Sequence, residues 1–178
     1  MNITAMYFSG TGTTKKVTAA IADELTEIKI SQDETTAGEN PGSIKAGINP
    51  WQRAEDIDFT PPAARREIYR FTPDDLVVFG VPVIAGRVPN VLLKFLDTLQ
   101  GGGALAVPVV LYGNRNFDDA LIELRNILQD RGFYAIGAAA FIGEHSFSRI
   151  LAAGRPDSSD MELSRDFARK LAGKIRRL

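Results

Sequence analysis

The sequence predicts an α/β fold built around a doubly wound parallel sheet. One observation behind this prediction is a set of apolar runs of strand length that do not alternate between apolar and polar residues, as is typical of strands covered on both faces. The other is a helical apolar pattern between these runs. The predicted strands are "NITAMYFS" at 2–9, "DLVVFGVPV" from Asp75, "ALAVPVVLY" from Ala104 and "FYAIGAAAFI" from Phe133.

Each predicted helix carries apolar residues mostly three or four positions apart, a spacing that places them on one face. These residues are Val17, Ala20, Ile21 and Leu25; Val91, Leu92, Phe95, Leu96 and Leu99; Leu121, Leu124, Ile127 and Leu128; and Leu163, Phe167, Leu171 and Ile175. The last helix also carries basic residues, which we expect to form a solvated face near its C-terminus.

The stretch from 31 to 70 follows this pattern less clearly. Its first part is rich in Gly, Pro, Asn and charged residues, which predicts a long loop or insertion over about 31–55. We expect Trp51 to pin this loop to the surface. Either "TEIKIS" or "EDIDFT" can be the second strand. We favour "EDIDFT" because "PPAARREIYR" after it resembles a connecting helix.

Composition and charge exclude several classes of function. The 178 residues, of which 44% are hydrophobic, suffice for one domain with a sizeable core, so we predict a single domain over 1–178. The formal charge of -1 attracts neither nucleic acid nor an anionic membrane. Because the chain has no cysteine, it has no disulfide, thiolate nucleophile or cysteine-held cluster. Without a signal peptide or a spanning apolar run, we expect a cytoplasmic protein.

The segment "YFSGTGTT", residues 7–14, joins the first predicted strand to the first predicted helix. At such a junction, backbone N–H groups and the helix dipole favour an anion. Three phosphate-binding patterns compete here. The Walker A pattern fails because Gly12 is followed by Thr13 and not by lysine. The pattern G-x-G-x-x-G begins with Gly10 and Gly12 but meets Lys15 in place of its third glycine.

The third pattern, Ser/Thr-x-Thr-Gly-x-Thr, is matched at each position. At this point the sequence resembles the flavodoxin family, whose loop of this form wraps the phosphate of FMN. The residues expected to bind the phosphate are Ser9, Gly10, Thr11, Gly12, Thr13 and Thr14. The alternative for the same residues is an ordinary N-cap rich in Ser and Thr.

Further segments resemble flavodoxins in the same order along the chain. The set is "SGTGTTKK", "FGVPVIAGRVPN", "YGNRNFDDAL" and "FIGEHSFS". The resemblance covers almost the whole chain except about 31–55, and it implies a three-layer α/β/α fold with a five-stranded parallel sheet in the order 2-1-3-4-5. It points to the flavodoxin domain of flavodoxin-ferredoxin fusion proteins, in which a 4Fe-4S ferredoxin segment follows the last helix.

In such a sheet the ligand lies outside the carboxyl ends of the strands, so the third strand should end at a flavin contact. The residues implied there are Pro82, Val83, Ile84, Ala85, Gly86 and Arg87. By resemblance, the Ala85–Gly86 peptide turns toward flavin N5, and its carbonyl accepts a hydrogen bond in the reduced states. Arg87 either reaches the flavin or an anionic substrate, or is solvated. The alternative for this loop is a simple strand-to-helix connection.

The loop after the fourth strand is implied to hold the polar edge of the flavin through backbone amides. Its residues are Gly113, Asn114, Arg115, Asn116 and Phe117. Phe117 either stacks on the flavin ring or packs against Leu121 as a hydrophobic staple. We expect Asp118 to cap the next helix. Glu144 and His145 form either a polar loop or a proton-handling pair, and two such residues are too few for a metal site.

The leading functional hypothesis is an FMN-binding electron-transfer domain in which no side chain is catalytic. One alternative is an FMN-dependent NAD(P)H or quinone reductase. Another is a binding module that has this fold without the flavin. The resemblance also implies a redox partner protein, which is a ferredoxin or a 4Fe-4S domain missing from this chain. From the net charge and the lack of a spanning apolar run, we expect neither nucleic acid nor a membrane as a partner.

Overall fold

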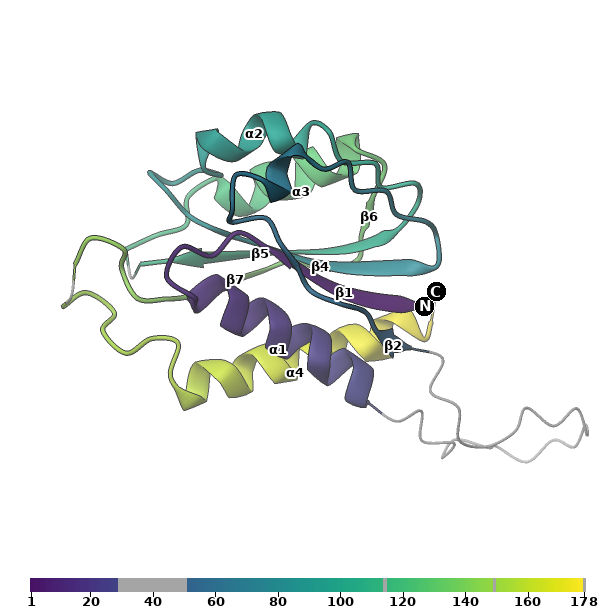
Figure 1. The fold of residues 1–178 in the computed structure, drawn as a ribbon. Coiled ribbons are helices and arrows are strands. Elements are labelled where there is room, and N and C mark those ends of the chain that lie inside the picture. Colours follow the sequence, from purple (N-terminus) through teal and green to yellow (C-terminus); the bar gives the residue numbers. More distant parts are fainter. Residues whose placement is uncertain (29–50, 114, 149, 178) are drawn as a thin grey trace, which may run out of the picture.

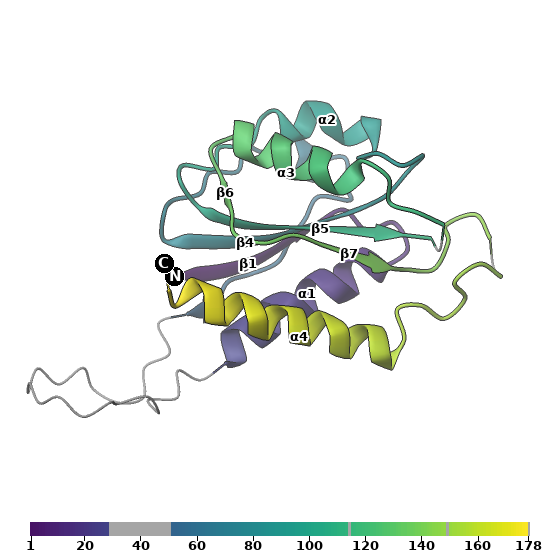
Figure 2. The same ribbon diagram turned by 180° about the vertical axis from the view of Figure 1, so that it is seen from behind.

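The computed structural model describes residues 1–28, 51–113, 115–148 and 150–177. These residues form three layers, with α1 and α4 on one face of a parallel sheet and α2 and α3 on the other, as Figure 1 and Figure 2 show. The helices are α1 (Thr13–Glu27), α2 (Asn90–Leu96), α3 (Ala120–Asp130) and α4 (Ser158–Ile175). Within the described ranges, no helix is both long enough and apolar enough to cross a membrane.

The sheet has the predicted five strand positions in the order 2-1-3-4-5. Its strands are β1 (Asn2–Tyr7), β2 (Gln52–Arg53), β3 (Ile57–Asp58), β4 (Asp75–Pro82), β5 (Leu105–Tyr112), β6 (Tyr134–Ala135) and β7 (Ala139–Ile142). The path runs β2-β1-β4-β5-β6, while β3 also pairs with β1 and β7 also pairs with β5. Because β2 and β3 share one edge position and β6 and β7 share the other, the predicted doubly wound parallel sheet is confirmed.

At each edge of the sheet, the edge chain has one extra residue that separates its two short strands. Between the pairs Ile3–Arg53 and Met6–Ile57, β1 advances by three residues while its partner advances by four. The same offset separates the pairs that β5 makes with β6 and β7. A single extra residue of this kind is a bulge, which occurs most often at sheet edges and interrupts pairing. The interruption explains why one predicted strand from Phe133 is two short strands in the structure.

The apolar runs predicted to be covered on both faces do contribute to two cores. Along β4, Leu76 and Val78 pack into the cluster under α1 and α4, whereas Val77 and Phe79 pack into the cluster under α2 and α3. All four side chains are fully buried. This two-sided burial is the reason that the strand sequences lack polar alternation.

The second strand and the segment after it differ in part from the prediction. The favoured segment "EDIDFT" does contain β3, but the connecting helix expected over 61–70 is wrong, because a single 3₁₀ turn, η1 (Ala64–Arg66), lies there. The chain then extends, and Arg70 pairs with Gln100 in an isolated bridge. Tertiary pairing therefore overrides the local helical tendency.

Most of the predicted loop over 31–55 lies outside the described residues, and its end joins the sheet. Residues 52 and 53 form β2, and Trp51 before them is 7% exposed. Trp51 packs with Ala22 and Leu25 of α1 in one core cluster. Trp51 is therefore part of the core, and its expected role of pinning the loop to the surface stays a prediction because most of that loop lies outside the described residues. The other candidate strand, "TEIKIS", begins inside α1.

The buried face of α4 differs from the predicted one. Leu163, expected to be in the core, is 60% exposed, while Met161 and Ala168 are buried.

A capping box fixes the start of α4. The Asp157 carboxylate accepts from the Asp160 amide, and the Asp160 carboxylate accepts from the Asp157 amide. The basic face is partly used for packing, because Arg169 Nε donates to Glu24 Oε1 of α1 at 2.9 Å.

Candidate functional site

A cavity lies where four parallel strands end. The segments after β1, β4, β5 and β7 gather at the end of the sheet opposite the two chain termini (Figure 1). They enclose about 750 Å³, a volume typical of cofactor sites. The lining residues are Phe8, Gly10, Thr11, Thr13, Thr14, Pro82, Val83, Ile84, Ala85, Gly86, Leu111, Tyr112, Gly113, Arg115, Asn116, Asp118, Gly143, Glu144, His145, Ser146 and Phe147.

The loop after β1 presents backbone donors to this cavity. Gly12 has a φ of 86° and precedes the first residue of α1. No acceptor in the described part of the chain pairs with the amides of residues 10–14. A Cβ placed on Gly10 would meet no atom within 4 Å, so the space in front of this loop is open. Unpaired amides at a helix N-terminus make a site for an anion.

The hydroxyl groups of this loop divide between structure and cavity. Ser9 Oγ accepts from the Lys15 amide at 3.0 Å and does not line the cavity, so Ser9 ties the loop to the first turn of α1, whose N-cap residue is Gly12. Thr11 Oγ1 and Thr13 Oγ1 lie 3.1 Å apart and both line the cavity. Thr14 also lines it, while Gly12 shapes the backbone without lining it.

The segment after β4 forms a tight turn at the cavity. Ile84 N–H donates to Arg87 O at 3.0 Å, and Arg87 N–H donates to Ile84 O at 3.1 Å. The two central residues, Ala85 and Gly86, have φ values of 51° and 74°. Positive φ at both central positions defines a type I′ turn. Of the residues expected in this loop, Pro82 to Gly86 line the cavity.

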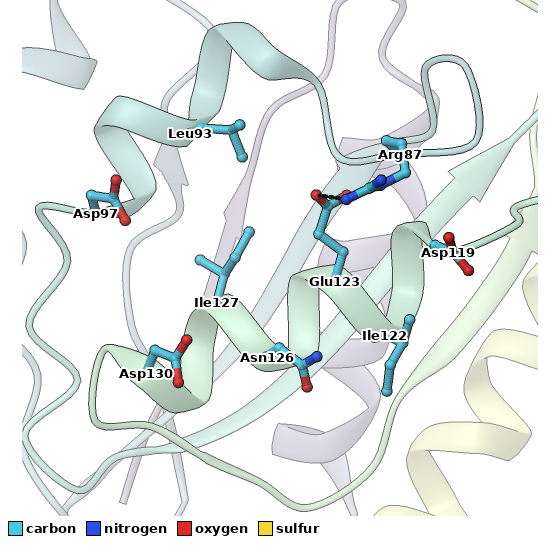
Figure 3. A pocket seen from close by; sticks show the side chains of 9 residues that line it. All are labelled: Arg87, Leu93, Asp97, Asp119, Ile122, Glu123, Asn126, Ile127 and Asp130. Carbon is cyan, nitrogen blue, oxygen red and sulfur yellow. Dashed lines mark hydrogen bonds and ion pairs between the residues drawn. The ribbon is translucent and has the colours of Figure 1, made fainter.

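Arg87 points away from this cavity and into another. Its guanidinium binds Glu123 through two hydrogen bonds, Nη2 to Oε1 at 2.6 Å and Nε to Oε2 at 3.0 Å. Glu123 Oε2 also accepts from Val88 N–H at 2.8 Å. The pair lies at one end of a cavity of about 490 Å³ between α2 and α3 (Figure 3). The hydrogen bond from Arg87 lowers the pKa of Glu123, so this carboxylate is ionised at neutral pH.

The loop after β5 brings some of its expected residues to the cavity. Gly113, Arg115 and Asn116 line it, and Asn114 lies outside the described residues. Phe117 does not line it. Instead it packs against the core under α2 and α3, where Leu121 also packs, with its ring centroid 5.6 Å from that of Tyr112. This packing favours the staple alternative over stacking on a ligand.

Asp118 occupies a different place from the expected one. The residue before α3 is Asp119, which makes no side-chain cap, so the capping role expected of Asp118 is wrong. Asp118 has a φ of 42°, lines the cavity and accepts from Asn116 Nδ2 at 2.8 Å. Its carboxylate lies against Gly86, where an added Cβ would come within 2.5 Å of Asp118 Oδ2.

The segment after β7 supplies a fourth side of the cavity, including Glu144 and His145. His145 Nδ1 accepts from Phe147 N–H at 3.1 Å, which places the proton of the neutral ring on Nε2. The ring packs closely on Gly113, since a Cβ there would lie 2.7 Å from His145 Cδ2. Across the described ranges, no three His, Cys, Asp or Glu side chains form a group that could hold a metal.

Sequence reasoning missed several residues that line the cavity. They are Phe8, Leu111, Tyr112, Asp118, Gly143, Ser146 and Phe147. Phe8, Leu111 and Tyr112 lie in or directly after the last residues of two strands, so the rule that ligands bind at strand ends could have identified them. The remaining ones lie in loops whose course depends on tertiary contacts.

The site therefore combines an anion-binding end with a larger apolar region. The open amides lie at the start of α1, while Val83 and Ile84 of the loop after β4 and Leu111 and Tyr112 of β5 provide apolar surface. Polar groups from the segments after β5 and β7 complete the rim. Such a cavity can hold a planar aromatic group that carries a phosphate.

Comparison with known proteins identifies the fold through structure and not through sequence. No protein-family model matches the chain, and neither does any curated protein. A flavodoxin from the domain Archaea shares 14% identity at a TM-score of 0.58, with 99% of each chain covered. Oxidised Flavodoxin 2 from Bacillus cereus shares 15% identity at 0.59, covering 98% of this chain and 99% of that one.

An enzyme has the same fold. The apo form of an NADH:FMN oxidoreductase (EMOB) shares 17% identity at a TM-score of 0.59, covering 96% of this chain and 88% of that chain. At these identities the likeness establishes the fold alone, and the fold of this chain is flavodoxin-like.

Proposed function

We propose that this protein binds FMN and transfers electrons through it. The observation that carries the proposal is the row of unpaired amides at residues 10–14, which opens into the cavity of about 750 Å³ at the strand ends. A phosphate bound there satisfies donors that otherwise have no protein partner in the described residues. The flavodoxin-like fold supports the same cofactor.

The residues present fit the parts of FMN. Thr11, Thr13 and the loop amides offer hydrogen bonds to a phosphate without any lysine. Val83, Ile84, Leu111 and Tyr112 offer apolar contact to the ring system. Gly113, Arg115 and Asn116 line the cavity and could offer polar groups to its pyrimidine edge, the role that the resemblance implies for this loop.

The bound flavin supplies the electron chemistry, and the protein binds and orients it. The loop at 10–14 would hold the phosphate end, and the apolar residues Val83, Ile84, Leu111 and Tyr112 would contact the ring. Tyr112 is packed against Phe117, which steadies the apolar surface. In this proposal none of these side chains needs to exchange a proton with a substrate.

A titration of the purified chain with FMN tests the proposal. We expect quenching of flavin fluorescence with one equivalent bound and a visible absorption band that follows the protein through gel filtration. Fluorescence that stays unquenched at micromolar protein would contradict the proposal and favour the module without flavin. A steady-state assay with NADPH and a quinone distinguishes the reductase alternative, because rapid turnover is not expected of an electron carrier.

We also propose that the electron partner is a ferredoxin or a 4Fe-4S domain, as the resemblance implies. Exposed apolar side chains at the cavity support a protein partner, since Ile84 is 50% and Phe147 is 91% exposed. Stopped-flow reduction of the FMN-loaded chain by a reduced ferredoxin tests this proposal, and a rate no faster than that of free FMN would contradict it. The fusion with a ferredoxin segment and the cytoplasmic location stay predictions.

A further inference from the structure

The turn from Ile84 to Arg87 is held in place by the first turn of α3. Asp119 N–H donates to Gly86 O at 3.1 Å. Glu123 accepts from both the Arg87 guanidinium and the Val88 amide. We call these contacts the α3 clamp. The clamp therefore binds three groups at the end of the turn: the carbonyl of Gly86, the guanidinium of Arg87 and the amide of Val88.

The central peptide, which joins Ala85 to Gly86, is the part of the turn that faces the cavity without a partner. Its carbonyl and its N–H make no hydrogen bond to any described residue. Both Ala85 and Gly86 line the cavity. This peptide is therefore free to contact a ligand, and its orientation decides whether the ligand meets a donor or an acceptor.

The side chain of Ala85 opposes a half rotation of the Ala85–Gly86 peptide. Turning the central peptide of a type I′ turn by half a rotation gives a type II′ turn, whose first central position is a glycine position. That position is Ala85, which already has a φ of 51° and would move to a region that is closed to a Cβ. Asp118 also lies against Gly86, at 2.5 Å from where its Cβ would be, and limits movement of the second residue.

We propose that Glu123 is a positioning residue that, together with Ala85, keeps the Ala85–Gly86 peptide in one orientation in every redox state of the bound flavin. The inference rests on the proposed FMN function for its effect on redox chemistry. It replaces the expectation that the glycine lets this peptide turn as the flavin is reduced. A fixed peptide offers the same group to oxidised flavin, whose N5 accepts a hydrogen bond, and to reduced flavin, whose N5–H donates one, so it favours one of the two states and cannot adapt to both.

Amide hydrogen exchange on the full chain without flavin tests the clamp itself. In Glu123→Ala we expect the amides of Arg87 and Val88 to exchange about tenfold faster, because their local opening no longer breaks the contacts to Glu123. Glu123→Gln, which keeps one acceptor, should show a smaller increase. Amides of β5 serve as the internal reference. Glu162→Ala is the matched control, since Glu162 also binds an arginine, Arg169 at 2.8 Å, but lies on the exposed face of α4. Unchanged exchange at Arg87 and Val88 would overturn the proposal.

The two one-electron potentials of the FMN-loaded chain test the consequence. Ala85→Gly permits the second orientation, and we expect the separation between the two potentials to change by the equivalent of about fivefold in relative binding, the effect of one hydrogen bond. Glu123→Ala should change it in the same direction, and Glu162→Ala should not change it. If FMN binds but Ala85→Gly and Glu123→Ala both keep the wild-type potentials, the proposal is wrong. If FMN does not bind, the proposed function fails, and hydrogen exchange still decides whether the clamp exists.

Discussion

The loop after β1 and the turn after β4 bound the same cavity but are built in opposite ways. The amides of residues 10–14 have no acceptor among the described residues, so these donors remain available to a ligand. The turn from Ile84 to Arg87 is completed by the protein, through hydrogen bonds to α3. We therefore expect the affinity for FMN to depend on the loop after β1, and the redox potentials of a bound flavin to depend on the turn after β4.

The largest expected effect comes from crowding the contact between β4 and α1, the helix that follows the first loop. Gly80 in β4 lies under α1, and a Cβ there would overlap Thr18 Oγ1 and come within 2.9 Å of Thr14 Cγ2. We expect Gly80→Ala to lower the free energy of unfolding by about 2 kcal/mol, which is typical of overpacking. Denaturation in urea measures it.

Gly173→Ala in α4 is the control for this change. The Cβ would approach only Arg177 Nη2, at 3.9 Å. Removing a helical glycine should therefore raise the free energy of unfolding by up to about 1 kcal/mol. A Gly80→Ala variant as stable as the wild type would show that α1 is not packed on β4 as described.

The next change tests the anion site of the first loop directly. Gly10→Asp places a negative charge where the phosphate is proposed to bind, and the open space around Gly10 lets the chain fold. Gly10→Asn has the same shape without the charge. We expect FMN to bind about tenfold more weakly to the Asp variant than to the Asn variant, with a gap that shrinks in high salt. Equal affinities by isothermal titration calorimetry would contradict an anion site here.

The sequence predicts the loop after β1 but not the contacts that hold the turn after β4. The first loop was predictable because a strand, a Gly- and Thr-rich segment and a helix follow one another without a gap. The α3 clamp was not, because Arg87 and Glu123 are 36 positions apart and nothing local links them. The same reason explains the failed prediction of a helix at 61–70, where Arg70 pairs with the distant Gln100. Local patterns therefore identify the loop with unpaired amides, while long-range pairs determine the turn that is hydrogen-bonded to α3.

Acid should weaken the clamp at the second loop. The hydrogen bond from Arg87 lowers the pKa of Glu123 in the folded chain, so the unfolded chain binds more protons between the two pKa values. The contribution of Glu123 to stability is therefore complete above its ordinary pKa and is lost as the pH falls through the lowered one. We expect the difference in urea midpoint between wild type and Glu123→Gln to be constant near neutral pH and to shrink below about pH 4. A difference that does not depend on pH would refute this assignment.

The smallest expected effect concerns the strain in the turn. Ala85 and Ala152 have nearly the same positive φ, 51° and 52°. Replacing either by glycine should raise the free energy of unfolding by about 0.5 kcal/mol, because the relief of strain exceeds the added entropy of the unfolded chain. Of the two variants, we expect Ala85→Gly to change the flavin potentials and Ala152→Gly to leave them as in the wild type. Potential shifts of equal size in both variants would contradict a local role for the turn.

The central claim is that the open amides at residues 10–14 bind the phosphate of FMN. Calorimetric titration of the chain with FMN and with riboflavin, which has the same ring and no phosphate, tests it most directly. We predict that FMN binds about 100-fold more tightly or better, since each charge-assisted hydrogen bond contributes about 1.5–3 kcal/mol. Equal affinities for FMN and riboflavin, or no binding of either, would contradict the claim.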